Sequence, residues 1–174
     1  MNSAELTKRK LQSMLAGLGL VALLVVASVA HGAGGPFLGL SGAWTGPGTV
    51  TLAGGTRENI RCRATYNVDG SGANLRLDLR CSSDSFKFEL QSTVSHNNGE
   101  VSGFWNEATN RIGGTVSGKA AGNKIEVVVA GPLSAKIALS TNADRQSVSI
   151  QSPGSKVSEV AISLSRGIKQ AALQ

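Results

Sequence analysis

The chain of 174 residues has few of the side chains on which metal sites and acid–base catalysis usually depend. It holds two histidines, two cysteines and one tyrosine, and aromatic residues make up only 4% of the sequence. Two cysteines and two histidines do not supply the ligand sets of most metal clusters, and they leave little for histidine-based catalysis. Proline is also scarce, at four residues, so the 22 glycines do not indicate a proline-rich disordered chain. These counts favour a binding or structural role over an enzymatic one.

Beyond residue 30 the chain has no run of lysine or arginine of the kind that lines a nucleic-acid groove. Its net charge is +6, from 17 basic and 11 acidic residues. Three of the basic residues and one acidic residue lie in the first 30 positions, so the remainder carries 14 basic and 10 acidic residues in dispersed positions. This mild balance is typical of a solvated surface and predicts no nucleic-acid partner.

The first 30 residues have the pattern of an export signal. Lys8, Arg9 and Lys10 form a basic region, no charge occurs at positions 11–30, and the segment ends with small residues at Ser28 and Ala30. A basic region, an apolar region and small residues at the cleavage site are the parts of a secretory signal peptide. We therefore expect residues 1–30 to be removed and the protein to be periplasmic or secreted in a bacterium, touching the membrane only through this segment. The alternative is an uncleaved anchor helix, because about 20 apolar residues can span a bilayer.

From residue 42 onward, apolar and polar residues alternate with a period of two, interrupted by turn-forming residues every eight to twelve positions. This alternation predicts half-buried strands joined by tight turns. The last six strands are expected at 100–108, 112–119, 123–130, 133–140, 146–151 and 157–166. We predict an all-β protein in which a signal helix and a glycine-rich flexible lead at 31–40 precede an antiparallel up-and-down barrel of about eight to ten strands at 41–166. Residues 167–174 form a tail, and a sandwich is the alternative to the barrel.

The two cysteines lie symmetrically about a turn near residues 69–74. If Val68 lies opposite Leu75 on adjacent antiparallel strands, then Cys62 lies opposite Cys81 on the apolar face. Directly opposed cysteines can reach bridging distance, most readily at a non-hydrogen-bonded pair. In an exported protein we expect them to be oxidised, with a stabilisation on the order of 3 kcal/mol. A metal site or a catalytic thiol lacks companion ligands, since no second cysteine pair or nearby histidine is present.

The same register places Arg63 beside Arg80 on the outer face of the hairpin. Arg61 and Arg76 flank them, and Asp78 is the only acid nearby. This small basic patch has two interpretations: a surface for anionic lipid or a polyanion, or an ordinary solvated face in which Asp78 pairs with an arginine. Because strand exteriors are normally charged, the sequence favours the solvated face.

Gly42 and Trp44 form a Gly-x-Trp element on the first strand, and Arg166 ends the last strand on the inward-facing side. A tryptophan packed under an arginine would close one end of a barrel by a cation–π contact. These three residues resemble the Gly-x-Trp and arginine signature of the lipocalin-like (calycin) barrels, and the resemblance implies a small apolar ligand. The wider pattern over 42–166 also resembles exported bacterial proteins of unknown activity, which implies no function.

The candidate ligand-binding residues are Trp44, Tyr66, Trp105, Glu107 and Arg166, because each combines an inward position with an aromatic or charged side chain. A carboxyl group turned inward beside an indole predicts a raised pKa for Glu107 and the capacity to act as a general acid. No second inward carboxyl group completes a catalytic pair. Small inward residues at Gly103, Gly114, Gly118 and Ala135 are compatible with either a cavity or a filled interior.

A copper site is the one enzymatic or metal alternative. Cleavage after Ala30 would make His31 the first residue, and a terminal histidine can bind Cu(II) through its amine and its ring. Only His96 is present to supply a second ring, and we expect it in a solvated turn at 95–99. We therefore predict no metal and no cofactor.

The sequence thus predicts an exported, non-enzymatic barrel that binds a small apolar or amphipathic ligand. The alternative is a structural or protein-interaction component of the cell envelope with a filled core.

Overall fold

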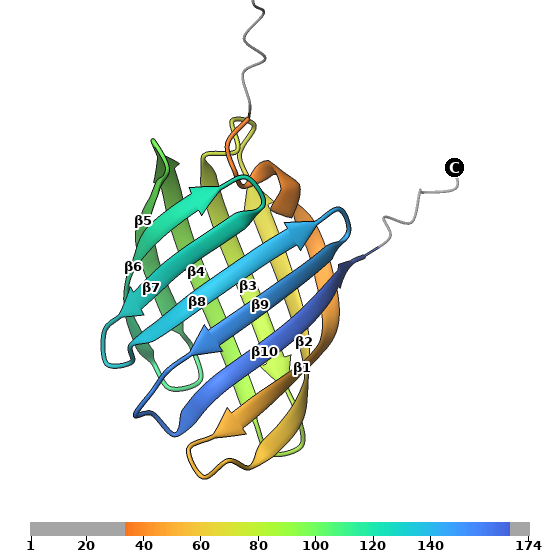
Figure 1. Cartoon of the computed structure of the whole chain (residues 1–174), viewed down its shortest axis with the longest axis vertical. Helices are drawn as coiled ribbons and strands as arrows, with labels where there is room; N and C mark the ends of the chain where they lie inside the picture. The colour runs from red at the N-terminus through yellow and green to blue at the C-terminus, as the bar shows by residue number, and fades with distance from the viewer. Residues whose placement is uncertain (1–33, 168–174) are drawn as a thin grey trace, which may run out of the picture. The chain divides into compact units, whose positions relative to one another are not determined.

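The structure is a computed structural model that describes residues 34–167, and the predicted signal peptide lies outside them. Ten antiparallel strands form a closed barrel in which each strand pairs with its neighbours in sequence and β1 pairs with β10 (Figure 1). The strands are β1 (Gly42–Leu52), β2 (Arg57–Val68), β3 (Asn74–Ser82), β4 (Lys87–Asn97), β5 (Glu100–Glu107), β6 (Ile112–Ala121), β7 (Lys124–Ala130), β8 (Ala135–Asn142), β9 (Arg145–Gln151) and β10 (Val157–Arg166). This confirms the all-β antiparallel barrel. Among the described residues, no helix is long and apolar enough to cross a membrane.

The alternating sequence pattern explains why these segments form the wall of a barrel. In β2 the side chains of Ile60 and Cys62 are buried inside, whereas Arg61 and Arg63 between them are exposed outside. Successive strand residues point to opposite faces, so each strand presents one apolar side to the interior. The last six strands begin and end within two residues of the predicted positions.

The barrel has two different ends. The lead end carries the turns at 69–73, 98–99, 122–123 and 143–144, together with residues 34–41. The far end carries the turns at 53–56, 83–86, 108–111, 131–134 and 152–156.

Residues 34–40 were expected to belong to a flexible lead, and this expectation is wrong for the described part. The segment ends in a short 3-10 helix, η1 (Leu38–Leu40), and the side chains of Phe37 and Leu40 are 0% and 2% exposed. The backbone N–H of Phe37 donates to the Gly72 carbonyl oxygen at 3.2 Å. A Cβ atom on Gly35 would lie 2.2 Å from that same oxygen, so the close backbone contact requires glycine. Burial of two apolar side chains holds this segment against the lead end.

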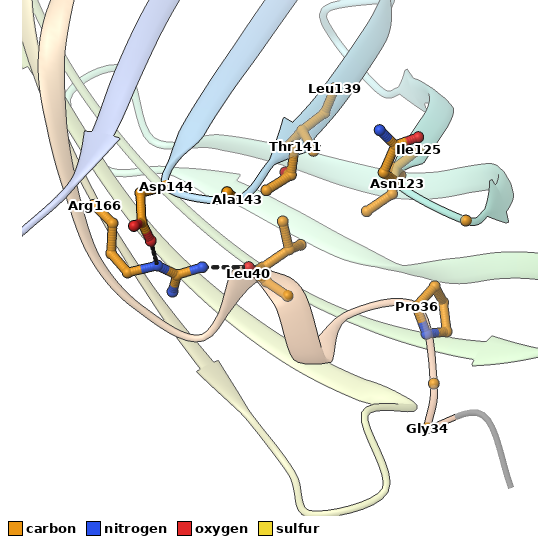
Figure 2. Close-up of a pocket in the computed structure, with 13 residues that line it drawn as sticks. Gly34, Pro36, Leu40, Asn123, Ile125, Leu139, Thr141, Ala143, Asp144 and Arg166 are labelled. Atoms are coloured by element: carbon orange, nitrogen blue, oxygen red, sulfur yellow. Dashed lines mark hydrogen bonds and ion pairs between the residues drawn. The ribbon is translucent and has the colours of Figure 1, made fainter. Parts of the chain in front are cut away.

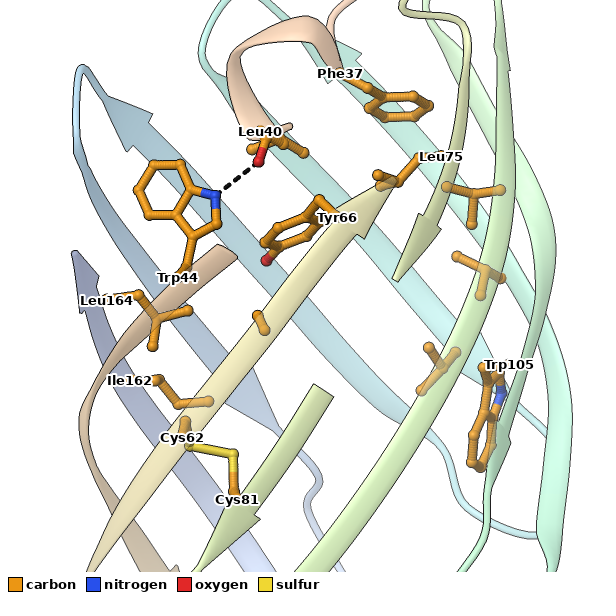
Figure 3. Packing of buried hydrophobic residues seen from close by; sticks show 14 of the residues in the cluster. Phe37, Leu40, Trp44, Cys62, Tyr66, Leu75, Cys81, Trp105, Ile162 and Leu164 are labelled. Carbon is orange, nitrogen blue, oxygen red and sulfur yellow. Dashed lines mark hydrogen bonds between the residues drawn. A yellow bond between two sulfur atoms is a disulfide. The ribbon is translucent and has the colours of Figure 1, made fainter. Parts of the chain in front are cut away.

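The cysteines form the predicted disulfide. Cys62 lies directly opposite Cys81, and their Cα atoms are 4.1 Å apart, close to the roughly 4.5 Å of a non-hydrogen-bonded pair. Val68 lies opposite Leu75, as the symmetric register requires. The bridge joins β2 and β3 inside the barrel (Figure 3).

Candidate functional site

The lead end is closed by a network around Trp44 and Arg166. The guanidinium carbon of Arg166 lies 4.2 Å from the centroid of the Trp44 ring, which confirms the predicted cation–π contact. The Trp44 indole N–H donates to the Leu40 carbonyl oxygen at 2.7 Å (Figure 3). The Arg166 guanidinium donates to the Gly39 carbonyl oxygen at 2.6 Å and to Asp144 at 2.9 Å. These bonds occupy the polar groups of both residues, so they fasten the lead to the barrel.

Tyr66 lies in the same closed region. Its hydroxyl group donates to Oε1 of Gln146 on β9 at 2.7 Å, and both side chains are buried. Burial raises the pKa of the Tyr66 phenol well above its usual range. Only β1 and β10 lie between β2 and β9 in the wall, so this bond joins two non-adjacent strands inside the barrel. Gln146 carries no signal in the sequence beyond an inward position in its strand.

A shallow pocket of about 490 Å³ lies between the lead and the rim of the barrel (Figure 2). Arg166 and Asp144 lie on one side of it, and Ile125 and Leu139 form an apolar part. The two charged groups pair with each other at 2.9 Å. Much of the remaining lining is glycine and backbone from 34–39 and the turns. This pocket therefore offers few side chains that are free to recognise a ligand.

Trp105 lies on β5, away from the Trp44 and Arg166 network, and its ring packs beside Gly114. Its indole N–H donates to the Ala130 carbonyl oxygen at 3.3 Å. Gly114 lies opposite it on β6, and a Cβ atom there would lie 1.7 Å from that oxygen and 3.0 Å from the indole nitrogen. The small residue at Gly114 thus makes room for a buried indole rather than for a ligand.

The structure corrects the prediction for Glu107. Its side chain is 1% exposed, and burial alone would raise its pKa. The backbone N–H groups of Asn110, Glu89 and Thr109 donate to the carboxylate at 2.7, 3.1 and 2.8 Å, and together they lower the pKa to about 2. A carboxyl group that stays ionised cannot serve as a general acid near neutral pH. Glu107 instead holds the turn at 108–111.

His96 also differs from its prediction. It lies within β4 rather than in a solvated turn, and its ring packs edge-on against Phe37 with centroids 6.2 Å apart. Its Nε2 atom accepts the Gly99 N–H at 3.0 Å. His31 lies outside the described residues, so the structure does not test the copper alternative. Within residues 34–167 no group of three or more potential metal ligands is present.

The far end contains an apolar cavity of about 260 Å³ inside the barrel. The side chains that line it from the wall and turns are Ile60, Leu79, Cys81, Phe86, Phe88, Ile112, Leu133, Ala135, Ile150, Val157, Val160 and Ile162. Lys87, Asn110, Ser152, Ser155 and Lys156 complete the lining near the turns. Its largely apolar lining is typical of a site for a small apolar molecule.

The inward side chains around this cavity are not fully covered. Leu79, Ile150 and Val160 point inward and pack against the core but remain only partly buried. Phe86 and Phe88 stack on each other with ring centroids 6.5 Å apart, which extends the apolar surface toward the 83–86 turn.

None of the five predicted ligand-binding residues lines this cavity. Trp44, Tyr66 and Arg166 come together at the lead end, whereas Trp105 and Glu107 lie apart from them on β5. The residues that line the cavity were expected to face inward, but nothing distinguished them from core residues. In the sequence, the only feature that indicates the cavity is the number of apolar residues beside the far-end turns, including Phe86 and Leu133.

Residues 34–167 thus form a closed ten-stranded antiparallel barrel, with the Trp44 and Arg166 network at the lead end and an apolar cavity at the far end. No family model matches the chain, and no curated protein matches it. A solved structure with a similar fold is that of Rv2717c from M. tuberculosis, at a TM-score of 0.59 and 15% sequence identity, over 75% of this chain and 94% of that one. At this identity the similarity shows the fold alone. It does not extend to the lipocalin resemblance of Gly42, Trp44 and Arg166.

Proposed function

We propose that the protein is an exported carrier that binds one small apolar or amphipathic molecule in the far-end cavity and does not transform it. The observation that carries the proposal is the combination of an apolar cavity of about 260 Å³ at one end with a tightly closed opposite end. A ligand therefore enters and leaves the cavity at the far end. The disulfide between Cys62 and Cys81 is compatible with an oxidising, exported location.

The cavity volume limits the size of the ligand. At about 30 Å³ for each atom of water size, it has room for about nine non-hydrogen atoms. A dry cavity of about 150 Å³ lined by Leu, Ile and Phe is large enough for benzene. The expected ligand is therefore a medium-length alkyl chain or a substituted ring, not a large polycyclic cofactor.

The polar lining supports an amphipathic ligand with an anionic group at the mouth. Lys156, in the turn at 152–156, lines the cavity and is exposed. Lys87 also lines it, and its ammonium group lies 3.2 Å from the Glu89 carboxylate. The buried hydroxyl of Ser152 donates to the Ser134 carbonyl oxygen at 2.7 Å, so it is already satisfied. An alkanoate with its chain inside and its carboxylate beside Lys156 fits these groups.

Calorimetric titration with octanoate tests the proposal. Ala135 lines the cavity and is buried, whereas Ala138 lies on the outer face of the same strand and is exposed. Ala135→Leu adds three carbon atoms to the cavity, and at about 0.8 kcal/mol for each methylene group displaced we expect binding to weaken by about 50-fold. Ala138→Leu is the matched control and should leave binding unchanged. Equal affinity in wild type and Ala135→Leu, with both variants folded, would place the ligand elsewhere.

One observation supports the alternative of a protein-interaction component of the envelope. The Phe104 side chain, on the outer face of β5, is 70% exposed, and Val128 on β7 is also exposed. Exposed aromatic rings are common in protein interfaces. If the wild-type protein binds no alkanoate and no small aromatic molecule, this alternative replaces the carrier.

A further inference from the structure

The outer face of β2 and β3 carries five exposed arginines, which we call the arginine face. They are Arg57, Arg61, Arg63, Arg76 and Arg80. Alternation along the two strands puts them all on the outside, opposite the buried side of the hairpin. By contrast, the outer faces of β9 and β10 consist largely of serine and alanine, including Ser149, Ala161 and Ser163. Five of the eight arginines among residues 34–167 thus lie on one wall of the barrel.

The arginine face is poorly neutralised. Arg63 lies directly opposite Arg80, and the Arg76 guanidinium lies 3.9 Å from the Asp78 carboxylate. Glu89 lies opposite Arg80 on β4, but its carboxylate contacts the Lys87 ammonium at 3.2 Å. Among residues 34–167, no carboxylate lies within 4.0 Å of the charged groups of the other four arginines. The predicted pairing of Asp78 with an arginine therefore covers only one of the five.

Folding does not require this arrangement. Two like charges directly opposite each other on neighbouring strands destabilise a sheet, so the Arg63 and Arg80 pair opposes folding. The inner side of the hairpin, with its disulfide and apolar pairs, already fixes the register. A residue pair that destabilises the fold and is not needed to form it is expected at a binding surface.

We propose that the arginine face docks the protein on a membrane surface rich in anionic phospholipid. One guanidinium group can donate hydrogen bonds to two oxygens of the same phosphate group. Several guanidinium groups on one sheet face can therefore contact several lipid phosphates of a membrane surface at once. The outer positions of β2 and β3 contain no aromatic side chain on which bases could stack, which disfavours single-stranded nucleic acid. This surface lies outside the barrel and does not depend on the proposed cavity function.

Flotation with lipid vesicles tests the docking surface. The protein is mixed with vesicles of phosphatidylcholine alone or with equal parts of phosphatidylglycerol, and the ratio of the two partition coefficients is measured. Apolar insertion of residues 1–30 would raise both partition coefficients alike, so it cancels in this ratio. Each cation near an anionic surface contributes about fivefold, so Arg63→Gln/Arg80→Gln should lower the ratio by about 25-fold. The matched control is Lys124→Gln/Lys136→Gln, which removes the same charge from exposed positions on β7 and β8.

The outcomes separate the alternatives. A preference for anionic vesicles that falls with added salt, is lost in the arginine variant and persists in the lysine variant supports the proposal. Arg63→Lys/Arg80→Lys should keep most of the binding, because it keeps the charge. Absence of the preference in wild type overturns the proposal, as does an equal loss in the arginine and lysine variants. Tighter binding to heparin than to anionic vesicles at the same salt concentration also overturns it, in favour of a polyanion.

Discussion

Replacing Glu107 by glutamine tests the correction to this residue most sharply. The carboxylate accepts three backbone N–H groups and the Asn110 side-chain amide, and its pKa falls from 4.5 to about 2. One pKa unit corresponds to about 1.4 kcal/mol, so the ionised group stabilises the fold by roughly 3 kcal/mol. In Glu107→Gln, one oxygen is replaced by an NH₂ group, which faces N–H donors in either orientation of the amide: those of Asn110, or those of Glu89 and Thr109. We expect a loss of about 3 kcal/mol in the free energy of unfolding at pH 7.

The dependence on pH follows from the direction of the shift. Because the pKa of Glu107 is lower in the folded protein than in the unfolded chain, its stabilisation is fully present above about pH 5.5 and is lost as the pH falls toward 2. The difference between wild type and Glu107→Gln, measured by urea unfolding from pH 7 to pH 2.5, should therefore shrink over this range. Glu100→Gln is the control, because Glu100 lies exposed on the same strand, 3.7 Å from Lys119, and should cost less than about 1 kcal/mol. A difference that stays constant with pH, or is as small as that of the control, would refute the argument.

Three further predictions concern the frame of the barrel. Cys62→Ser should lower the free energy of unfolding by about 3 kcal/mol, and reduction of the wild type with dithiothreitol should reproduce the loss; equal stability in oxidised and reduced wild type would contradict the bridge. Gly114→Ala should destabilise the protein by more than about 2 kcal/mol, because its Cβ atom would meet the Ala130 carbonyl oxygen. Gly54→Ala meets no neighbouring atom and should be neutral in the same thermal unfolding assay; similar melting temperatures for the two variants would count against the packing. Arg166→Gln should release the lead, and limited proteolysis near residues 34–40 should become several-fold faster; unchanged cleavage would show that the apolar contacts suffice.

The sequence predicts the barrel and much of its register because both follow from local patterns. A period of two fixes the inward face of each strand, and the symmetric positions of Cys62 and Cys81 about a turn fix the pairing of β2 with β3. The contact of Trp44 with Arg166 follows from closing the first strand onto the last. These predictions need only alternation, turn positions and closure.

Other features depend on contacts that no local pattern reveals. The glycines of residues 34–40 predict a flexible lead, but the side chains of Phe37 and Leu40 are buried at the lead end of the barrel. The pKa of Glu107 depends on three N–H groups whose directions are set by the turn at 108–111 and by β4. The far-end cavity depends on the volume that the opposing walls leave, and an alternating sequence does not determine that volume.

The affinity for a series of alkanoates of increasing chain length tests the central claim most directly. For a cavity of about 260 Å³, the dissociation constant should fall by about fourfold for each added methylene group and stop falling near eight to nine carbon atoms. In Ala135→Leu the break should come about three carbon atoms earlier, while Ala138→Leu should follow the wild type. A break that appears at the same length in all three proteins, or an affinity that does not depend on chain length, would contradict the account of an apolar cavity that binds the ligand.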